Sequence, residues 1–143
     1  MFFGYYEHNL DNKGRLIIPS KMRDEAGYRV YIMKGFDGAL AIYKEEKFIE
    51  KTKELETLPF NKKAARDYLR MTLASACELE VDKIGRIQIP QTLLNKYGIG
   101  KELVIIGVGD HFEVWDKEKY LIYEDEANKN FEENAETLQD YDE

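Results

Sequence analysis

Cysteine is nearly absent from this sequence: Cys77 is the only one among 143 residues. Neither an intrachain disulfide nor a zinc site made of several cysteines can therefore form. No run of 18 apolar residues occurs, and the first residues lack the basic start and apolar stretch of a signal peptide. These absences lead us to expect a cytoplasmic protein.

The sequence also offers little raw material for catalysis. Cys77 with His8 or His111 could supply a nucleophile and a base, but Cys77 lies in an apolar stretch, where a cysteine is usually a small buried hydrophobe. No phosphate-cradling glycine loop follows a predicted strand, and no metal-ligand spacing occurs. We therefore expect no enzymatic activity, no cofactor and no metal site.

Acidic charge is distributed unevenly along the chain. The net charge is -7, but residues 124–143 hold nine acidic side chains and one lysine. Residues 1–123 are left with a net charge of +1. The acidity thus belongs to the C-terminal segment, and it does not exclude a nucleic-acid partner for the rest of the chain.

A nine-residue motif occurs twice, at residues 11–19 and 82–90. Five residue types (Asp, Gly, Arg, Ile and Pro) return in register at an offset of 71, which has on the order of one chance in 10^6 at ordinary residue frequencies. Further matches follow at an offset of 72: Gly35 with Gly107, Ile42 with Val114, Tyr43 with Trp115, Lys47 with Lys119 and Phe48 with Tyr120. A unit of about 45 residues is marginal alone. We therefore expect the two copies to fold against each other as one pseudo-twofold body.

Both repeats predict the same succession of elements. Strand-forming runs at Arg15–Ile18 and Arg86–Ile89 follow an Asp-x-x-Gly turn and stop at proline, which predicts a strand, a tight hairpin turn and a second strand. A short helix with proline at its start and glycine past its end follows in each copy. The remaining expected elements are strands at 30–33, 40–43, 103–106 and 112–115, and helices at 44–58, 62–76 and 117–138.

The segment Val81–Ile99 carries an aspartate, a loop, Gly-Arg and an apolar run that ends in proline. It resembles the AbrB-type swapped-hairpin DNA-binding module. Two such modules in one chain, with the sequence from Gly107 to Trp115 in the second, look like the MraZ family of bacterial transcriptional regulators. The resemblance implies an α+β fold, mostly β, in which two tandem repeats form a pseudo-twofold swapped-hairpin β-barrel with flanking helices.

The resemblance also implies a division of the chain. The expected parts are a first SpoVT-AbrB-type module at residues 5–47, a helical linker at 48–75, a second module at 76–119 and a C-terminal acidic helix or tail at 120–143. Members of the family form rings of several protomers. They bind short G-rich repeats in the promoter of the division and cell-wall gene cluster, usually as repressors.

We therefore expect a nucleoid-associated repressor that binds double-stranded promoter DNA as a homo-oligomeric ring, for which an octamer is one candidate. Neither a membrane nor a small-molecule substrate is expected as a partner. The alternative is an antitoxin-like or scaffold protein that acts through protein partners, because the acidic C-terminal segment could bind one.

Arg15 and Arg86 are the residues that we expect to read DNA. An arginine just after a tight turn can bond both O6 and N7 of guanine in the major groove. Asp11 and Asp82 could pair with these arginines and only hold the loops, and the two roles can coexist. The residues expected to shape the loops are Asp11, Gly14, Asp82 and Gly85.

Phosphate contacts are expected from basic side chains in or near the loops. These are Lys13, Lys21, Arg23, Lys83 and Lys96. A second basic run at helical spacing consists of Lys62, Lys63, Arg66 and Arg70. For that run a solvated face or a subunit contact is favoured over DNA.

Overall fold

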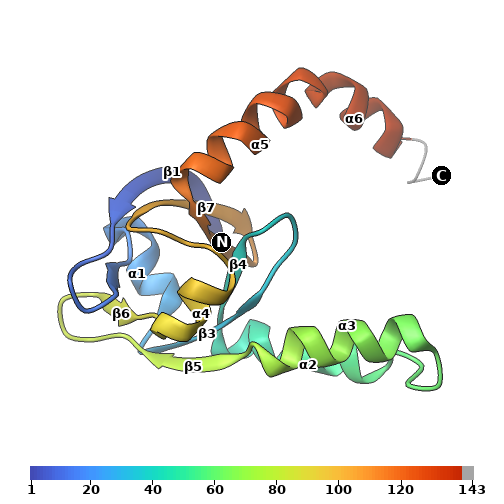
Figure 1. The fold of residues 1–143 in the computed structure, drawn as a ribbon, viewed down its shortest axis with the longest axis horizontal. Helices are drawn as coiled ribbons and strands as arrows, with labels where there is room; N and C mark the ends of the chain where they lie inside the picture. Colours follow the sequence, from blue (N-terminus) through green and yellow to red (C-terminus); the bar gives the residue numbers. More distant parts are fainter. Residues whose placement is uncertain (140–143) are drawn as a thin grey trace.

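The computed structural model describes residues 1–139, which form a body of antiparallel strands with two helical arms that project from it (Figure 1). The strands are β1 (Phe2–Asn9), β2 (Arg15–Ile17), β3 (Arg29–Lys34), β4 (Leu40–Lys44), β5 (Cys77–Glu80), β6 (Arg86–Gln88), β7 (Glu102–Gly109) and β8 (His111–Asp116). The helices are α1 (Ser20–Ala26), α2 (Glu45–Glu56), α3 (Lys63–Ala74), α4 (Gln91–Lys96), α5 (Lys117–Lys129) and α6 (Phe131–Gln139). Each strand and helix predicted from the two repeats has a counterpart here, which confirms the α+β class.

Strand pairing crosses from one repeat to the other. The larger sheet has the order β1-β7-β8-β4-β3-β5, and β2 pairs with β6 in a second, two-stranded sheet. The equivalent strands of the two repeats are β1 and β5, β2 and β6, β3 and β7, and β4 and β8. When each strand is replaced by its equivalent, the order of the larger sheet becomes β5-β3-β4-β8-β7-β1. This is the observed order read from the opposite edge. The fold therefore has the expected pseudo-twofold relation.

The hairpin prediction was only partly right. The tight turn at Asp11–Arg15 forms, but the strands on either side of it do not pair with each other. β1 pairs with β7 and β2 with β6, and both partners come from the second repeat. The larger sheet ends at β1 and β5, so the described strands form no closed barrel, and the barrel implied by the resemblance is not confirmed.

One apolar core joins the two repeats. Leu16 and Ile87 are fully buried and lie opposite each other in the β2–β6 pair. β1 runs so close to β7 that a Cβ on Gly107 would lie 2.1 Å from the backbone nitrogen of Phe3. Glycine is therefore required at this position for β1 to complete the sheet.

The helices form two groups. The short helices α1 and α4 lie within the body, and α1 ends at Gly27, whose φ of 76° is a left-handed conformation that suits glycine. α2 and α3 form one arm, and α5 and α6 form the other (Figure 1). The single C-terminal helix expected at 117–138 is broken at Asn130, whose φ of -98° and ψ of 11° end α5. Residues 140–143 of the expected acidic tail lie outside the described residues.

Over residues 1–139, the helices are too short or too polar to cross a membrane.

Candidate nucleic-acid interface

The loop from Asp11 to Arg15 is organised by one carboxylate. Asp11 Oδ1 accepts hydrogen bonds from the backbone N–H groups of Lys13 (2.9 Å) and Arg15 (2.8 Å). Asp11 Oδ2 accepts one from Arg15 Nε at 2.6 Å. The backbone N–H of Gly14 donates to the Asp11 carbonyl at 3.0 Å, and its φ of 74° needs a residue without a Cβ. Aspartate, glycine and arginine thus fix the loop together.

The loop from Asp82 to Arg86 repeats this geometry. Asp82 Oδ1 accepts from the N–H groups of Ile84 (3.1 Å) and Arg86 (2.8 Å), and Oδ2 accepts from Arg86 Nε at 2.7 Å. Gly85 has a φ of 86°, and its N–H donates to the Asp82 carbonyl at 3.0 Å. The repeated motif therefore encodes two copies of one loop structure.

Both aspartates are held in the charged form. The backbone N–H of Arg15 lowers the pKa of Asp11, with further contributions from the Arg15 side chain and the N–H of Lys13. The pKa of Asp82 is lowered in the same way, first by the backbone N–H of Arg86. Hydrogen bonds to a carboxylate favour its ionised form. At neutral pH each loop consequently contains a carboxylate that orients a guanidinium group.

Each arginine uses only Nε in its loop. The described residues include no hydrogen-bond partner for the two terminal amino groups of Arg15 or Arg86, and both side chains are partly exposed. A guanidinium that is held by its Nε still has the N–H groups of its two terminal nitrogens, which can donate to two acceptors on a planar partner. The structural and DNA-reading roles of these arginines are therefore compatible.

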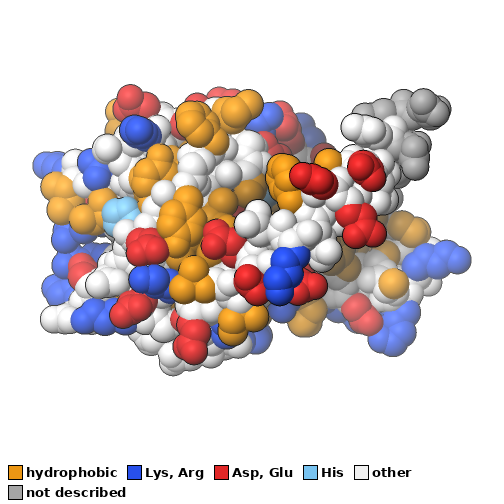
Figure 2. Space-filling view, turned by 90° about the horizontal axis from the view of Figure 1, so that it is seen from above, with side chains coloured by type: hydrophobic (Ala, Val, Ile, Leu, Met, Phe, Trp, Pro, Cys, Tyr) orange, Lys and Arg blue, Asp and Glu red, His pale blue; other side chains and the backbone are white. Residues whose placement is uncertain are grey.

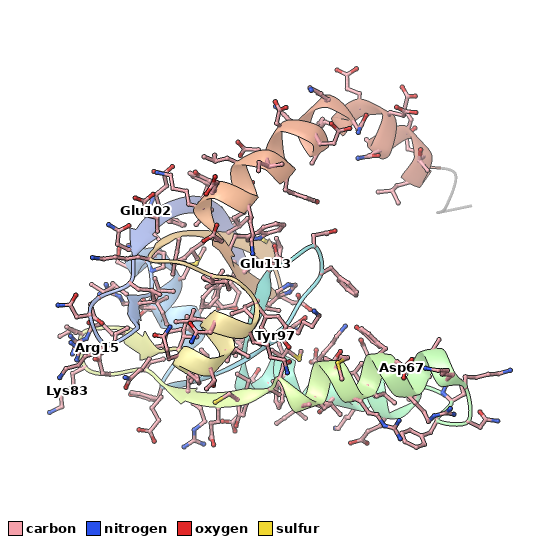
Figure 3. All side chains as sticks on the ribbon, viewed as in Figure 1. Arg15, Asp67, Lys83, Tyr97, Glu102 and Glu113 are labelled. Atoms are coloured by element: carbon pink, nitrogen blue, oxygen red, sulfur yellow. The ribbon has the colours of Figure 1, made fainter. Side chains whose placement is uncertain are left out.

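The exchange of strands brings the two loops to one end of the molecule. The N–H of Ile18 donates to the Gly85 carbonyl at 2.8 Å, and the N–H of Ile89 donates to the Gly14 carbonyl at 3.1 Å. Figure 3 places Arg15 and Lys83 at the same end, and Figure 2 shows Lys and Arg side chains gathered there, at the left of the view. One surface thus presents both loops.

Gln88 is a contributor that sequence reasoning missed. Its Nε2 donates to the Lys13 carbonyl at 2.9 Å, so a side chain of the second repeat supports the first loop. The two residues are 75 positions apart, and no spacing within the motif signals their contact.

Arg23 is brought to the second loop. Its Nε donates to the Ile18 carbonyl at 2.9 Å, and a Cβ on Gly85 would lie 2.3 Å from that same nitrogen. At the equivalent position under the first loop stands Leu94, whose Cδ1 is the nearest side-chain atom to Gly14. The second loop therefore has one more cation beside it than the first.

The other expected phosphate contacts are less closely placed. Lys13 and Lys83 are exposed within the first and second loops. Lys21 is exposed on α1, and Lys96 is exposed on α4. No hydrogen bond or ion pair joins either of these two lysines to a loop within residues 1–139.

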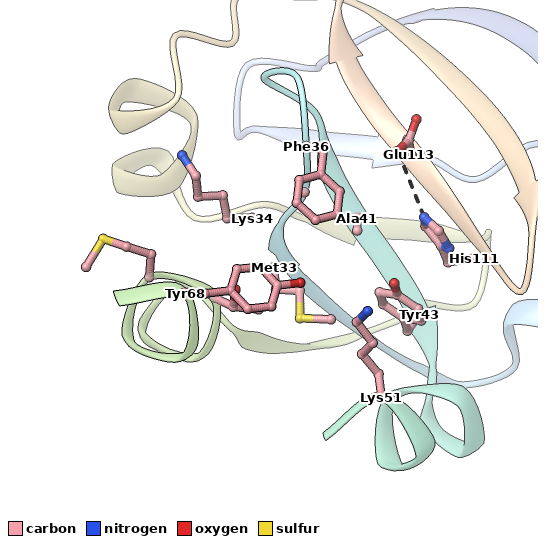
Figure 4. A pocket seen from close by; sticks show the side chains of 12 residues that line it. Met33, Lys34, Phe36, Ala41, Tyr43, Lys51, Tyr68, His111 and Glu113 are labelled. Atoms are coloured by element: carbon pink, nitrogen blue, oxygen red, sulfur yellow. Dashed lines mark ion pairs between the residues drawn. The ribbon is translucent and has the colours of Figure 1, made fainter. Parts of the chain in front are cut away.

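A separate hollow of about 270 Å³ lies between the body and α3, with Tyr43 and His111 in its wall (Figure 4). Their rings stack at 4.6 Å between centroids. Burial lowers the pKa of His111, but the nearby carboxylates of Glu113 (3.9 Å from Nε2) and Asp110 (2.7 Å from Nδ1) outweigh it, so the pKa lies above its ordinary value. Among residues 1–139 no interaction joins Cys77 to a histidine, and no group of His, Cys, Asp and Glu is arranged to hold a metal ion.

Comparisons with known proteins agree with the repeated structure. The family described as "MraZ protein, putative antitoxin-like" matches residues 1–71 and again 72–142. The chain is 43% identical over 142 residues to the transcriptional regulator MraZ of Finegoldia magna, with 99% of both chains covered. It is 39% identical over 142 residues to the protein of the same name from Ligilactobacillus salivarius (99% of both chains) and 42% identical over 140 residues to that from Lactobacillus helveticus (98% of both). The chain belongs to the MraZ family.

Proposed function

We propose that this protein is a DNA-binding transcriptional regulator, rather than an enzyme, and that it reads double-stranded DNA through its two Asp–Arg loops. The observation that carries the proposal is the matching geometry of the loops on one surface. In each, an aspartate holds the arginine by Nε and leaves its terminal amino groups available. The names of the relatives support the regulatory role.

The target that suits these loops is a short G-rich sequence. Guanine presents O6 and N7 as adjacent acceptors in the major groove, and arginine is their most common specific partner. Such a pair contributes about 1–3 kcal/mol of discrimination against the wrong base. Lys13, Lys83 and Arg23 would add phosphate contacts that are independent of sequence and sensitive to salt.

We further propose repression, from repeated boxes in the promoter of the division and cell-wall gene cluster, by a ring of several chains associated with the nucleoid in the cytoplasm. The modules that bind would be residues 5–47 and 76–119. One chain offers two arginine loops on a body of nearly neutral charge, so its own affinity is modest. A ring that engages several boxes at once gains affinity by about 10^2-fold or more.

Fluorescence anisotropy with a duplex of repeated G-rich boxes, beside a scrambled duplex, tests this function. We expect tight, salt-sensitive binding to the boxes only, and its loss in Arg15→Ala/Arg86→Ala. The matched variant Arg15→Lys/Arg86→Lys keeps the charge but not the fork of donors, so it should retain weak binding without preference. Equal binding of the wild type to both duplexes would overturn the proposal.

A second candidate is an antitoxin-like or scaffold protein, and the exposed acidic arm formed by α5 and α6 favours it. In that case the arm would bind a protein partner of a different kind. The wild type would then behave in solution as one or two chains rather than as several.

A further inference from the structure

The C-terminal arm, α5 with α6, exposes apolar side chains that nothing in the described chain covers. Only its first turns contact the body, where Tyr120 and Tyr123 pack on Trp115. Neither helix contains a buried residue. The large apolar side chains that it exposes are Leu121, Ile122, Tyr123, Phe131 and Leu138.

The outer helix of this arm, α6, is too short to be stable in isolation. α6 has nine residues, and Phe131, Ala135 and Leu138 lie on one of its faces at positions i, i+4 and i+7. Helices shorter than roughly 12–15 residues are marginal in water unless an apolar face is packed against something. The arm therefore needs an apolar surface to cover this face.

The α2–α3 arm presents such a surface. An open, mainly apolar groove of about 650 Å³ runs between the end of α2 and α3. Leu58, Phe60, Leu69 and Leu73 line it, and Phe60 is more than half exposed. Exposed apolar patches of this kind are typical of protein–protein contacts.

The two arms carry opposite charges. Residues 57–74 hold four basic side chains and one acidic one, whereas residues 120–139 hold six acidic side chains and one lysine. Figure 2 shows acidic side chains along the C-terminal arm and Lys and Arg side chains at the far end of the α2–α3 arm. When two apolar faces are surrounded by charges of opposite sign, the attraction between these charges favours their contact and fixes its orientation.

The two arms of one chain stay apart. They leave the body at different strands and diverge in Figure 1, and no hydrogen bond or ion pair joins them within residues 1–139. Each chain thus carries two complementary surfaces that it does not join to each other. A contact between two different surfaces of identical chains repeats from copy to copy, and it closes into a ring when the rotation permits.

We propose that the α5–α6 arm of one chain docks in the α2–α3 groove of a second copy. This contact supplies the interface of the proposed ring and rests on that part of the proposed function. It also assigns Lys62, Lys63, Arg66 and Arg70 to the subunit contact rather than to DNA.

The molecular mass in solution, measured by sedimentation velocity, tests the interface. We expect the wild type at several times 16.8 kDa. We expect Phe131→Asp/Leu138→Asp at the mass of one chain, with a circular dichroism spectrum that loses at most the helical signal of α6. Phe3→Asp is the matched control, because Phe3 and Phe131 are both 69% exposed and only Phe131 lies on an arm. This control should keep the wild-type mass.

Charge exchange tests whether the two arms face each other. Lys62→Glu/Lys63→Glu and Glu132→Lys/Glu133→Lys should each lower the mass, and the four changes together should restore it. An unchanged mass in Phe131→Asp/Leu138→Asp, or no recovery in the combined variant, would overturn the interface.

DNA-binding measurements distinguish a wrong interface from a wrong proposed function. The one-chain variants should bind a duplex with a single box like the wild type, yet lose about 10^2-fold in affinity for repeated boxes. A wild type that forms the ring but does not prefer the box would contradict the proposed function and leave the interface standing. A wild type of one chain that still prefers the box would contradict the interface and the ring, and would leave the reading of DNA by the two loops standing.

Discussion

Asp11 and Asp82 each divide their two oxygens between the backbone of the loop and the side chain of an arginine. Because hydrogen bonds lower the pKa of both carboxyls, the folded state favours their charged form. Their contribution to stability is present above the ordinary aspartate pKa of about 3.9, and it is lost as the pH falls through the lower pKa of the folded state.

We therefore predict that the free energy of unfolding falls with acidification below about pH 5, and that Asp11→Asn/Asp82→Asn makes this fall less steep. Urea unfolding between pH 3 and pH 7 measures both slopes. An identical pH dependence in the two proteins would show that these carboxyls are not preferentially charged in the folded state.

Arg23 makes the two loops unequal. Arg23→Leu places a leucine beside the second loop, as Leu94 already stands beside the first. We predict that this variant binds DNA more weakly, and that its affinity depends less steeply on salt concentration, by the equivalent of about one phosphate contact. The effect should be larger in an Arg15→Ala background, where only the second loop reads DNA, than in Arg86→Ala. Lys53→Leu, which removes an exposed lysine on α2 that is not expected to contact DNA, is the control. Equal effects in the two backgrounds would contradict the assignment of Arg23 to the second loop.

Among the elements, the short β2–β6 pair joins the repeats at the loops. Leu16→Ala and Ile87→Ala should each reduce the free energy of unfolding by about 2–5 kcal/mol, because both side chains are fully buried. Since they lie opposite each other, the loss of unfolding free energy in the double variant should differ from the sum of the two single losses by about 0.5–3 kcal/mol. Ile17→Ala, at a position that is 40% exposed, should cost much less. Additive effects in urea unfolding would mean that the two residues do not share one core.

The position of most elements could be predicted from the sequence, but their partners could not. Proline, glycine and the apolar periodicity mark where helices and strands begin and end, and the turn at Asp11–Gly14 follows from the same chemistry. Pairing of β1 with β7 depends on contacts about 100 residues apart, and a local pattern carries no information on them. Arg23 was expected to contact phosphate, but its place against Gly85 depends on the same long-range pairing. The break at Asn130 was missed because the apolar stripe continues across it.

At the scale of the whole molecule, each repeat pairs only two of its own strands, β3 with β4 and β7 with β8, and every other strand pair joins the two repeats. We predict that residues 1–58 and 59–143, expressed apart, are largely unfolded, and that mixing them restores the circular dichroism spectrum of the intact chain. The cut falls between α2 and α3, where no strand is interrupted. A half that folds alone with a cooperative urea transition would contradict the shared core.

The central claim is that the arginine forks read guanine, and base substitution within the box tests it most directly. Replacing guanine by 7-deazaguanine removes N7 while leaving the Watson–Crick edge intact, so it removes one acceptor of the bidentate pair. Anisotropy titrations would compare the normal and the substituted duplex, with the wild type and with Arg15→Ala/Arg86→Ala. We predict that the substitution weakens binding by the wild type several-fold and has no effect on the double variant. An equal loss in both proteins, or none in the wild type, would show that these arginines hold the loops without reading the base.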